Sequence, residues 1–234
     1  MKDVWNSLGI GLVLLSSDFH VIGLNDYARQ LYGPMLKELG GSVLQCHSPK
    51  GRAKASAVLQ ELTSASSDMP RTMVVDALGK VLMYNLSELA IVSPTPRTCW
   101  SVTFIDVSAQ TGAETSPLSG ELEMKKFPVY DRGTYHFLPT RSVHYIQSDG
   151  DYSKIFTGGK SFYMHSSLKN ILRRYTGASF FRVHRGFVVN LDRVDRLTRN
   201  SKGQTLIMFD DMSLSPVPVS RRRLAELKKA IHSL

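Results

Sequence analysis

Short apolar runs alternate with polar turns along the first hundred residues of the chain. Two such runs flank Ser16–Asp18 in the segment 9–25, which reads GIGLVLLSSDFHVIGLN and predicts a β-hairpin. Asn25 is suited to cap a following helix, because apolar and aromatic residues follow it at helical spacing. Further elements are expected as a helix over 51–62 and strands over 72–77, 81–89 and 99–107. This order predicts an α+β fold with the helices gathered on one face of a sheet.

The second half of the chain reads mainly as β-strands separated by turn residues. Strands are expected over 143–147, 152–157, 160–165, 186–190, 194–198 and 204–209. Two helices are expected as well, one capped by Ser166 or Ser167 and one capped by Ser220. The sequence contains neither a helix-turn-helix pattern nor a zinc-ligand spacing, so the common helical readers of DNA are not indicated.

A segment of linker composition, SAQTGAETSPLSGELE at 108–123, separates the two halves. It is rich in small and polar residues and poor in large apolar ones. We therefore expect a first domain over 1–108, a linker over 109–124 and a second domain over 125–234.

The net charge differs sharply between the two halves. Residues 1–115 hold 9 Lys and Arg against 10 Asp and Glu, a net charge of −1. Residues 116–234 hold 20 against 10, a net charge of +10. Such a basic half fits a nucleic-acid partner, but it equally fits a surface that is merely well solvated.

The composition excludes several classes of protein. Cys46 and Cys99 are too few for a disulfide framework, which suggests a reducing, cytoplasmic compartment. The apolar run over 8–15 is too short to span a bilayer, so no membrane association is expected. The sequence shows no phosphate-binding loop, catalytic-triad pattern or metal-site spacing, so an enzyme is not expected.

The segment FFRVHRGFVVNL, which begins at Phe180, carries the first candidate contact with nucleic acid. Apolar residues alternate on either side of Arg182, His184 and Arg185, which predicts two strands joined at an exposed bend beside Gly186. Guanidinium and imidazole groups at such a bend could donate hydrogen bonds to base edges and phosphates.

A second candidate is the segment PVSRRR, which ends in Arg221, Arg222 and Arg223. These arginines fall in the first turn of an expected helix, where positive charge opposes the helix dipole unless an anion is near. Because free backbone amides also point outward there, a phosphate group would be favoured. The alternative is a solvated helix face on which the arginines pair with Glu226 or Asp192.

These motifs follow one another in the order of a LytTR DNA-binding domain, which the segment 125–234 resembles. The resemblance is carried by HYIQSDGDYSKIFT, SSLKNILRRY, FFRVHRGFVVNLDRV and VPVSRRRLAELKKAI. It implies an elongated, mainly β fold that places inter-strand loops in successive major grooves of double-stranded DNA. It also implies a homodimer that binds repeated half-sites.

By motif position the LytTR resemblance implies specific DNA contacts. Arg185 and Arg221 match the positions that contact bases, and Tyr152 or Ser153 matches a third contact region. The full set of expected DNA-binding residues is Arg185, Arg221, Tyr152, Ser153, His184, Arg222 and Arg223. Of these, His184 is expected to bond within its own loop, with a base contact as the alternative.

The segment 5–108 resembles a PAS sensor domain, through a strand pair leading into an N-D-x-A helix start and through its D-V-S ending. PAS domains either are empty or hold flavin, haem or a small acid. Here His47 precedes an expected helix and Met73 lies on an expected strand. Imidazole and thioether together suit haem iron, and a diatomic gas can displace the weak Met ligand. As alternatives, His47 is a helix cap or surface residue and Met73 a core residue.

The whole chain is similar to carbon-monoxide-responsive haem regulators built as a PAS domain followed by LytTR. The similarity implies haem b held by His47 and Met73, with Met83 as the second candidate for the distal ligand. It departs at 63–70, which lacks the cysteine that can bind ferric iron in such regulators. The expected function is therefore a transcriptional regulator that senses a diatomic gas, carbon monoxide. The alternative is a PAS–LytTR regulator that responds to another ligand or to dimerisation alone.

Overall fold

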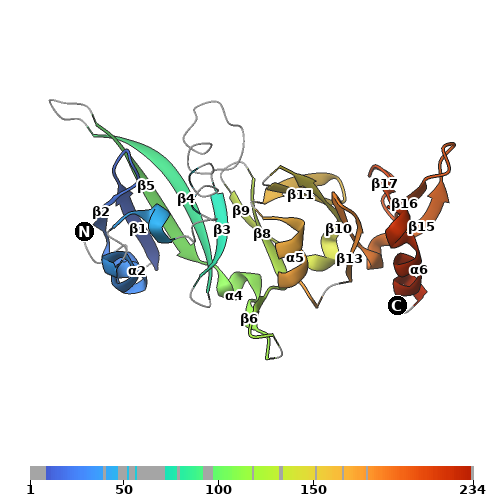
Figure 1. Ribbon diagram of the computed structural model, residues 1–234, viewed down its shortest axis with the longest axis horizontal. Coiled ribbons are helices and arrows are strands. Elements are labelled where there is room, and N and C mark those ends of the chain that lie inside the picture. Colours follow the sequence, from blue (N-terminus) through green and yellow to red (C-terminus); the bar gives the residue numbers. More distant parts are fainter. Residues whose placement is uncertain are drawn as a thin grey trace. The chain divides into compact units, whose positions relative to one another are not determined.

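The computed structural model divides the chain into two compact units (Figure 1). The first comprises residues 1–77 and 82–107, and the second comprises 78–81 and 108–234. The residues described are 9–38, 41–46, 52, 56, 72–77, 80–91, 97–117, 119–131, 134–150, 152–164, 166–177 and 179–232. Among these residues, no helix is long and apolar enough to cross a membrane.

The first unit is a five-stranded sheet with helices. Its strands are β1 (Ile10–Leu15), β2 (Val21–Leu24), β3 (Thr72–Ala77), β4 (Lys80–Ile91) and β5 (Arg97–Asp106), arranged in the order β2-β1-β5-β4-β3. The helices are α2 (Asp26–Glu38) and the 3-10 turn η1 (Val43–Cys46). The expected hairpin, first helix and three later strands are confirmed. The helix expected over 51–62 lies outside the described residues, apart from Arg52 and Ser56, which are helical.

Asn25 joins α2 to β1, and its expected capping role is confirmed. Its side-chain oxygen accepts hydrogen bonds from the backbone N–H of Ala28 and of Leu12, each at 3.0 Å. Its side-chain nitrogen donates to the carbonyl of Ile10 at 2.7 Å. One amide therefore satisfies the first turn of the helix and holds that helix against the sheet.

The core of the first unit lies between α2 and one face of the sheet. Phe104 of β5 is its centre, and its ring contacts the rings of Tyr27, Tyr32 and Tyr84. Gly11 of β1 is paired with Phe104, and a Cβ atom at Gly11 would come within 1.9 Å of the Phe104 ring. Only glycine leaves room for this ring, which explains a glycine in the middle of a strand.

The second unit is mainly β, as expected. A seven-stranded antiparallel sheet has the order β13-β14-β10-β11-β12-β8-β9, and a three-stranded sheet has the order β15-β16-β17. The strands are β6 (Glu114–Thr115), β7 (Leu122–Glu123), β8 (Lys126–Asp131), β9 (Thr134–Pro139), β10 (Val143–Asp149), β11 (Tyr152–Thr157), β12 (Lys160–Met164), β13 (Phe180–His184), β14 (Phe187–Asn190), β15 (Val194–Arg199), β16 (Thr205–Phe209) and β17 (Val217–Pro218).

Helical segments of the second unit are short. They are α4 (Ser108–Thr111), η2 (Thr140–Ser142), α5 (Leu168–Arg174), η3 (Leu191–Arg193), η4 (Arg221–Arg223) and α6 (Leu224–His232). Ser167 caps α5 by accepting a hydrogen bond from the backbone N–H of Asn170, which confirms one of the two expected caps. Ser220 occupies the cap position of η4, but its side chain makes no capping hydrogen bond.

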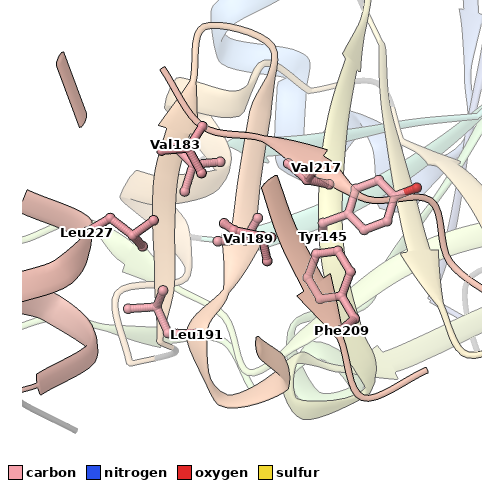
Figure 2. Close-up of a cluster of buried hydrophobic side chains, with 9 residues drawn as sticks. Tyr145, Val183, Val189, Leu191, Phe209, Val217 and Leu227 are labelled. Atoms are coloured by element: carbon pink, nitrogen blue, oxygen red, sulfur yellow. The ribbon is translucent and has the colours of Figure 1, made fainter. Parts of the chain in front are cut away.

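One apolar cluster fills the space between the two sheets and α6 (Figure 2). Tyr145 of β10 stacks on Phe156 of β11 and on Phe209 of β16, with ring centres 4.2 and 5.2 Å apart. Leu227 of α6 and Val183 of β13 are fully buried in the same cluster. The packing therefore holds the three-stranded sheet and α6 to β13, which precedes the predicted arginine bend.

The segment expected as a linker, 109–124, contains α4, β6 and β7 and is grouped with the second unit. Met124 is buried, and its backbone N–H donates to the carbonyl of Arg174 at 2.7 Å. Phe127 follows and stacks on Tyr175, with ring centres 3.8 Å apart. Burial raises the pKa of the Tyr175 phenol. The end of this segment thus contributes to the core of the second unit.

Candidate nucleic-acid interface

Side chains of the hairpin itself hold the backbone of the bend between β13 and β14. Residues 185 and 186 form the turn, and the backbone N–H of Gly186 donates to Nδ1 of His184 at 3.2 Å. The guanidinium of Arg182 donates to the carbonyl of Arg185 at 2.7 Å. His184 therefore bonds within its loop, as expected, and the backbone of Arg185 is held from two sides.

The Arg185 side chain points to solvent from this bend. It is exposed, and its guanidinium has no hydrogen bond or ion pair within the described residues. A guanidinium in this state keeps all five N–H donors available for an external acceptor. The bend therefore presents one free, planar donor group on a fixed backbone.

The second arginine segment forms η4, directly ahead of α6. Arg221 and Arg222 are exposed, and neither side chain has a partner in the part of the chain that the structure describes. Arg223 differs, because it forms an ion pair with Glu226 and lies over the ring of Phe181. Pairing with an acidic residue of the same helix, the alternative considered from sequence, thus holds for one arginine of the three.

Two hydrogen bonds join the arginine segments, although they are far apart in the chain. The backbone N–H of Ser220 donates to the carbonyl of Val183 at 2.9 Å. The Nε of Arg223 donates to the carbonyl of Arg182 at 3.0 Å. The structure therefore brings the two motifs found in the sequence onto one surface of the second unit.

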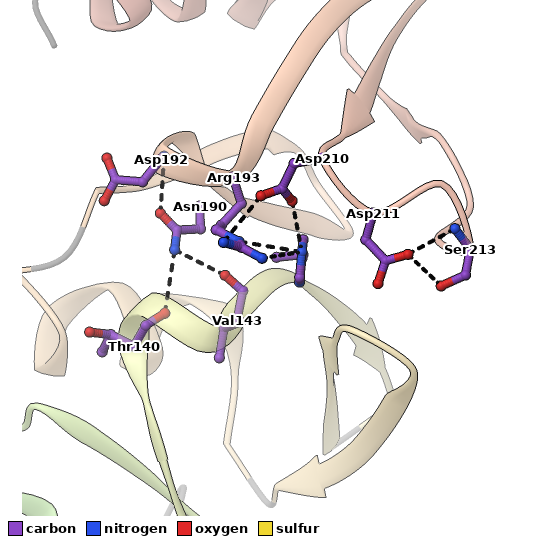
Figure 3. Close-up of polar contacts among 9 residues, drawn as sticks. Thr140, Val143, Asn190, Asp192, Arg193, Asp210, Asp211 and Ser213 are labelled. Carbon is purple, nitrogen blue, oxygen red and sulfur yellow. Dashed lines mark hydrogen bonds and ion pairs between the residues drawn. The ribbon is translucent and has the colours of Figure 1, made fainter.

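A polar cluster at the base of the three-stranded sheet adds a further link between the sheets (Figure 3). Nε2 of His144, on β10, lies 2.9 Å from a carboxylate oxygen of Asp210 and 3.0 Å from a guanidinium nitrogen of Arg193. Arg193 also pairs with Asp210 at 3.1 Å. Nearby, hydrogen bonds from the hydroxyl and the backbone of Ser213 lower the pKa of Asp211.

The third expected contact region does not fit a DNA contact. Tyr152 is 4% exposed and Ser153 is fully buried. The Ser153 hydroxyl donates to the carbonyl of Ser166 at 2.6 Å, so its hydrogen-bonding capacity is used inside the fold. The expectation of a DNA contact at these two side chains is corrected, because both lie in the interior.

The expected ligands of the first unit are placed only in part. His47 lies outside the described residues, directly after η1. Met73 is the second residue of β3, at one edge of the sheet, and its side chain lies outside the described part. Cys99 is buried on β5. In the chain, His47 therefore follows η1 directly, and Met73 lies near the start of β3.

Met83, the second candidate for the distal ligand, lies on β4 on the face away from α2. Leu82, Tyr84 and Leu86 of that strand belong to the cluster that contains Ala28 of α2. Because side chains alternate along a strand, Met83 lies on the sheet face opposite to α2. This placement removes Met83 from the face that carries the helices.

Comparisons with known proteins agree with this picture. Residues 133–232 match the LytTr DNA-binding domain, which confirms the resemblance found for 125–234. The chain is 28% identical to "Heme-containing CO-sensing transcriptional regulator RcoM 2" of Paraburkholderia xenovorans, over 94% of this chain and 88% of that protein. It is 26% identical to "CO-responsive transcriptional regulator RcoM" of Rhodospirillum rubrum, over 93% of this chain and 92% of that protein.

Proposed function

Since this chain is a transcriptional regulator with a LytTR DNA-binding domain, related to the RcoM regulators and not an enzyme, we propose that it reads DNA through Arg185, Arg221 and Arg222. The observation that carries this proposal is the hydrogen-bonded junction of the two arginine segments, at which these three guanidinium groups are exposed. A basic surface of this kind attracts the phosphate backbone, and fixed guanidinium groups discriminate between bases.

The three arginines divide between base and phosphate contacts. Arg185 stands on a turn and Arg221 opens η4, so both are presented from rigid backbone toward base edges. Arg222 follows Arg221 beside the free amides of the helix start, where a phosphate is favoured. A bidentate pair between arginine and guanine contributes about 1–3 kcal/mol of discrimination.

Arg185→Ala is expected to weaken binding to the specific duplex by about 5- to 150-fold and to change binding to a scrambled duplex far less. The probe is a duplex recovered by the wild-type protein from a random pool, and the measurement is fluorescence anisotropy at one fixed salt concentration. Equal losses on both duplexes would show that Arg185 does not read bases.

Arg141→Ala is the matched control for this prediction. Arg141 is also exposed, but it lies in η2, ahead of the first residue of β10. The arginine bend lies at the other end of that strand, where the N–H of Ser148 donates to Gly186. A strand of this length separates the two ends by roughly 20 Å. The control is therefore expected to bind both duplexes like the wild type.

For the first unit we propose a PAS sensor that holds haem b through His47 and Met73. The sheet order β2-β1-β5-β4-β3 with α2 on one face supports the PAS assignment. The donor set fits the group, because neutral imidazole and thioether are both ligands of haem iron. The names of the relatives, which describe haem-containing and CO-responsive regulators, support the same proposal.

His47 and Met73 would hold the haem, and its iron would supply a site that can bind carbon monoxide. His47 would keep the haem attached, and the hold on β3 would depend on whether Met73 is bound to the iron. Because β3 is an edge strand, it has a neighbour on one side only within the described sheet, and its position is easier to change than that of a central strand. We propose that this change alters a homodimer in the cytoplasm that binds repeated half-sites.

The absorption spectrum of the purified, reduced protein tests the sensor proposal. We expect a Soret band that shifts when carbon monoxide is added. Met73→Leu is expected to lose six-coordinate ferrous iron before the gas is added, whereas Met83→Leu keeps it. A protein expressed with ample haem that shows no Soret band would favour control by another ligand or by dimerisation alone, and would leave the DNA proposal intact.

A further inference from the structure

The hairpin that carries Arg185 contains a β-bulge. Arg182 pairs with Val188, and the next pair is His184 with Phe187, so Val183 is an extra residue on β13. The bulge disrupts the regular ladder between these pairs. At this place the carbonyls of Arg182 and Val183 accept hydrogen bonds from the second arginine segment.

The guanidinium of Arg182 donates hydrogen bonds within its own hairpin. Its side chain is half-buried and donates to the carbonyl of Arg185 at 2.7 Å and to the carbonyl of His184 at 3.4 Å. Hydrogen bonds from a charged donor are stronger than neutral ones. Arg182 therefore fixes the backbone from which the Arg185 side chain projects.

Arg223 makes three contacts within the second unit. Its Nε donates to the carbonyl of Arg182 at 3.0 Å, and a terminal nitrogen pairs with Glu226. The guanidinium carbon lies 5.3 Å from the centre of the Phe181 ring. A planar, delocalised cation can satisfy all three contacts at once, which an ammonium cannot. Arg223 thus ties η4 and α6 to the strand that carries Arg182.

From these contacts we propose that Arg182 and Arg223 are positioning residues that set the placement of Arg185 relative to Arg221 and Arg222. This inference rests on the proposed function of the exposed arginines. It separates the basic residues of the interface into two kinds. Those with occupied guanidinium groups hold the surface, and those without described partners contact DNA.

The placement matters because base recognition needs both arginine segments in register with one duplex. A bidentate contact requires its two N–H groups to meet two acceptors at hydrogen-bond distance. Loss of Arg182 frees the turn, and loss of Arg223 frees the start of η4. In both cases the phosphate attraction is retained, because it depends on charge more than on exact geometry.

The test uses the full chain, the duplex recovered from a random pool and a scrambled duplex. Arg182→Gln and Arg223→Gln are expected to lower affinity for the specific duplex by about tenfold, the size of one charge-assisted hydrogen bond. Affinity for the scrambled duplex should fall no more than in Arg141→Gln, which also removes one charge. Glu226→Gln releases Arg223 without changing β13, and its effect is expected in the same direction.

Two further readouts separate positioning from contact and from general destabilisation. The slope of log affinity against log salt should stay at the wild-type value in both variants, whereas loss of a phosphate contact lowers it by about 0.9. In the Arg185→Ala background, Arg182→Gln should have no further effect on specific binding, because the group it positions is gone.

Several outcomes would overturn the inference. A reduced salt slope would make Arg182 or Arg223 a DNA contact. Additive effects of Arg182→Gln and Arg185→Ala, or equal losses on both duplexes with a lower melting temperature, would leave only a general structural role. If Arg185→Ala alone loses specificity, only the positioning role fails. If no variant loses specificity, Arg185→Ala included, the proposed function fails with it.

Discussion

Replacing Tyr145 by alanine is expected to lower the free energy of unfolding of the second unit by about 4 kcal/mol. The side chain is 4% exposed and stacks on Phe156 of the larger sheet and on Phe209 of the smaller one. Its removal leaves a cavity where the two sheets meet and breaks two aromatic pairs. Chemical denaturation followed by circular dichroism measures the change.

DNA binding should also weaken, because the substitution destabilises the second unit as a whole, including both arginine segments. We expect Tyr145→Ala to weaken binding to specific and scrambled duplexes alike. Tyr145→Phe is the control, since the Tyr145 hydroxyl has no hydrogen bond within the described residues and the ring is kept. A change near zero is expected for it. If both variants lost the same stability, the stacked ring would not be the cause.

Replacing His144 by alanine is expected to cost about 2–3 kcal/mol, from the cavity and from the loss of a buried hydrogen-bonding partner. The imidazole is buried on β10 and contacts Asp210 and Arg193, both of which belong to the part of the chain that forms the smaller sheet. Asp210 and Arg193 are about two-fifths exposed, so their mutual ion pair is screened and cannot replace the imidazole.

Asp195→Asn is the matched control for the His144 prediction. Asp195 forms an ion pair with the adjacent Arg196 on the exposed part of β15, so its removal should change the free energy of unfolding by less than about 0.5 kcal/mol. Both variants are compared by urea denaturation at one pH. Equal midpoints for His144→Ala and Asp195→Asn would show that the polar cluster does not hold the sheets together.

Local patterns in the sequence were enough to find both arginine segments of the interface. Alternation of apolar residues marks β13 and β14, and a polar interruption marks the bend, so exposure of Arg185 followed from neighbouring residues alone. The contact of Arg223 with the carbonyl of Arg182 could not be predicted in this way. It depends on the bulge at Val183, which exists only through pairing with β14.

Two errors have physical causes that alternation does not reveal. Tyr152 or Ser153 was expected to contact DNA because of its motif position, but β11 is a central strand whose residues at 152 and 153 are both buried. Strands β8 and β9 were not among the strands expected from the sequence, and each contains a proline, Pro128 and Pro139, a residue that is unfavourable in strands. Pro139 is the last residue of the edge strand β9, where a missing backbone N–H is tolerated.

Because of the bulge at Val183, the arrangement of the arginine segments depends on the number of residues in β13 as well as on their identity. Deletion of Val183 would restore regular pairing with β14, because Arg182 and His184 would then be adjacent and would keep their partners Val188 and Phe187. The carbonyl that now accepts the hydrogen bond from Ser220 would be lost with Val183, and the backbone next to the carbonyl that binds Arg223 would lose its bulge. A shorter hairpin could therefore keep all its arginines and still lose its target, which makes single-residue insertions and deletions here more consequential than most substitutions.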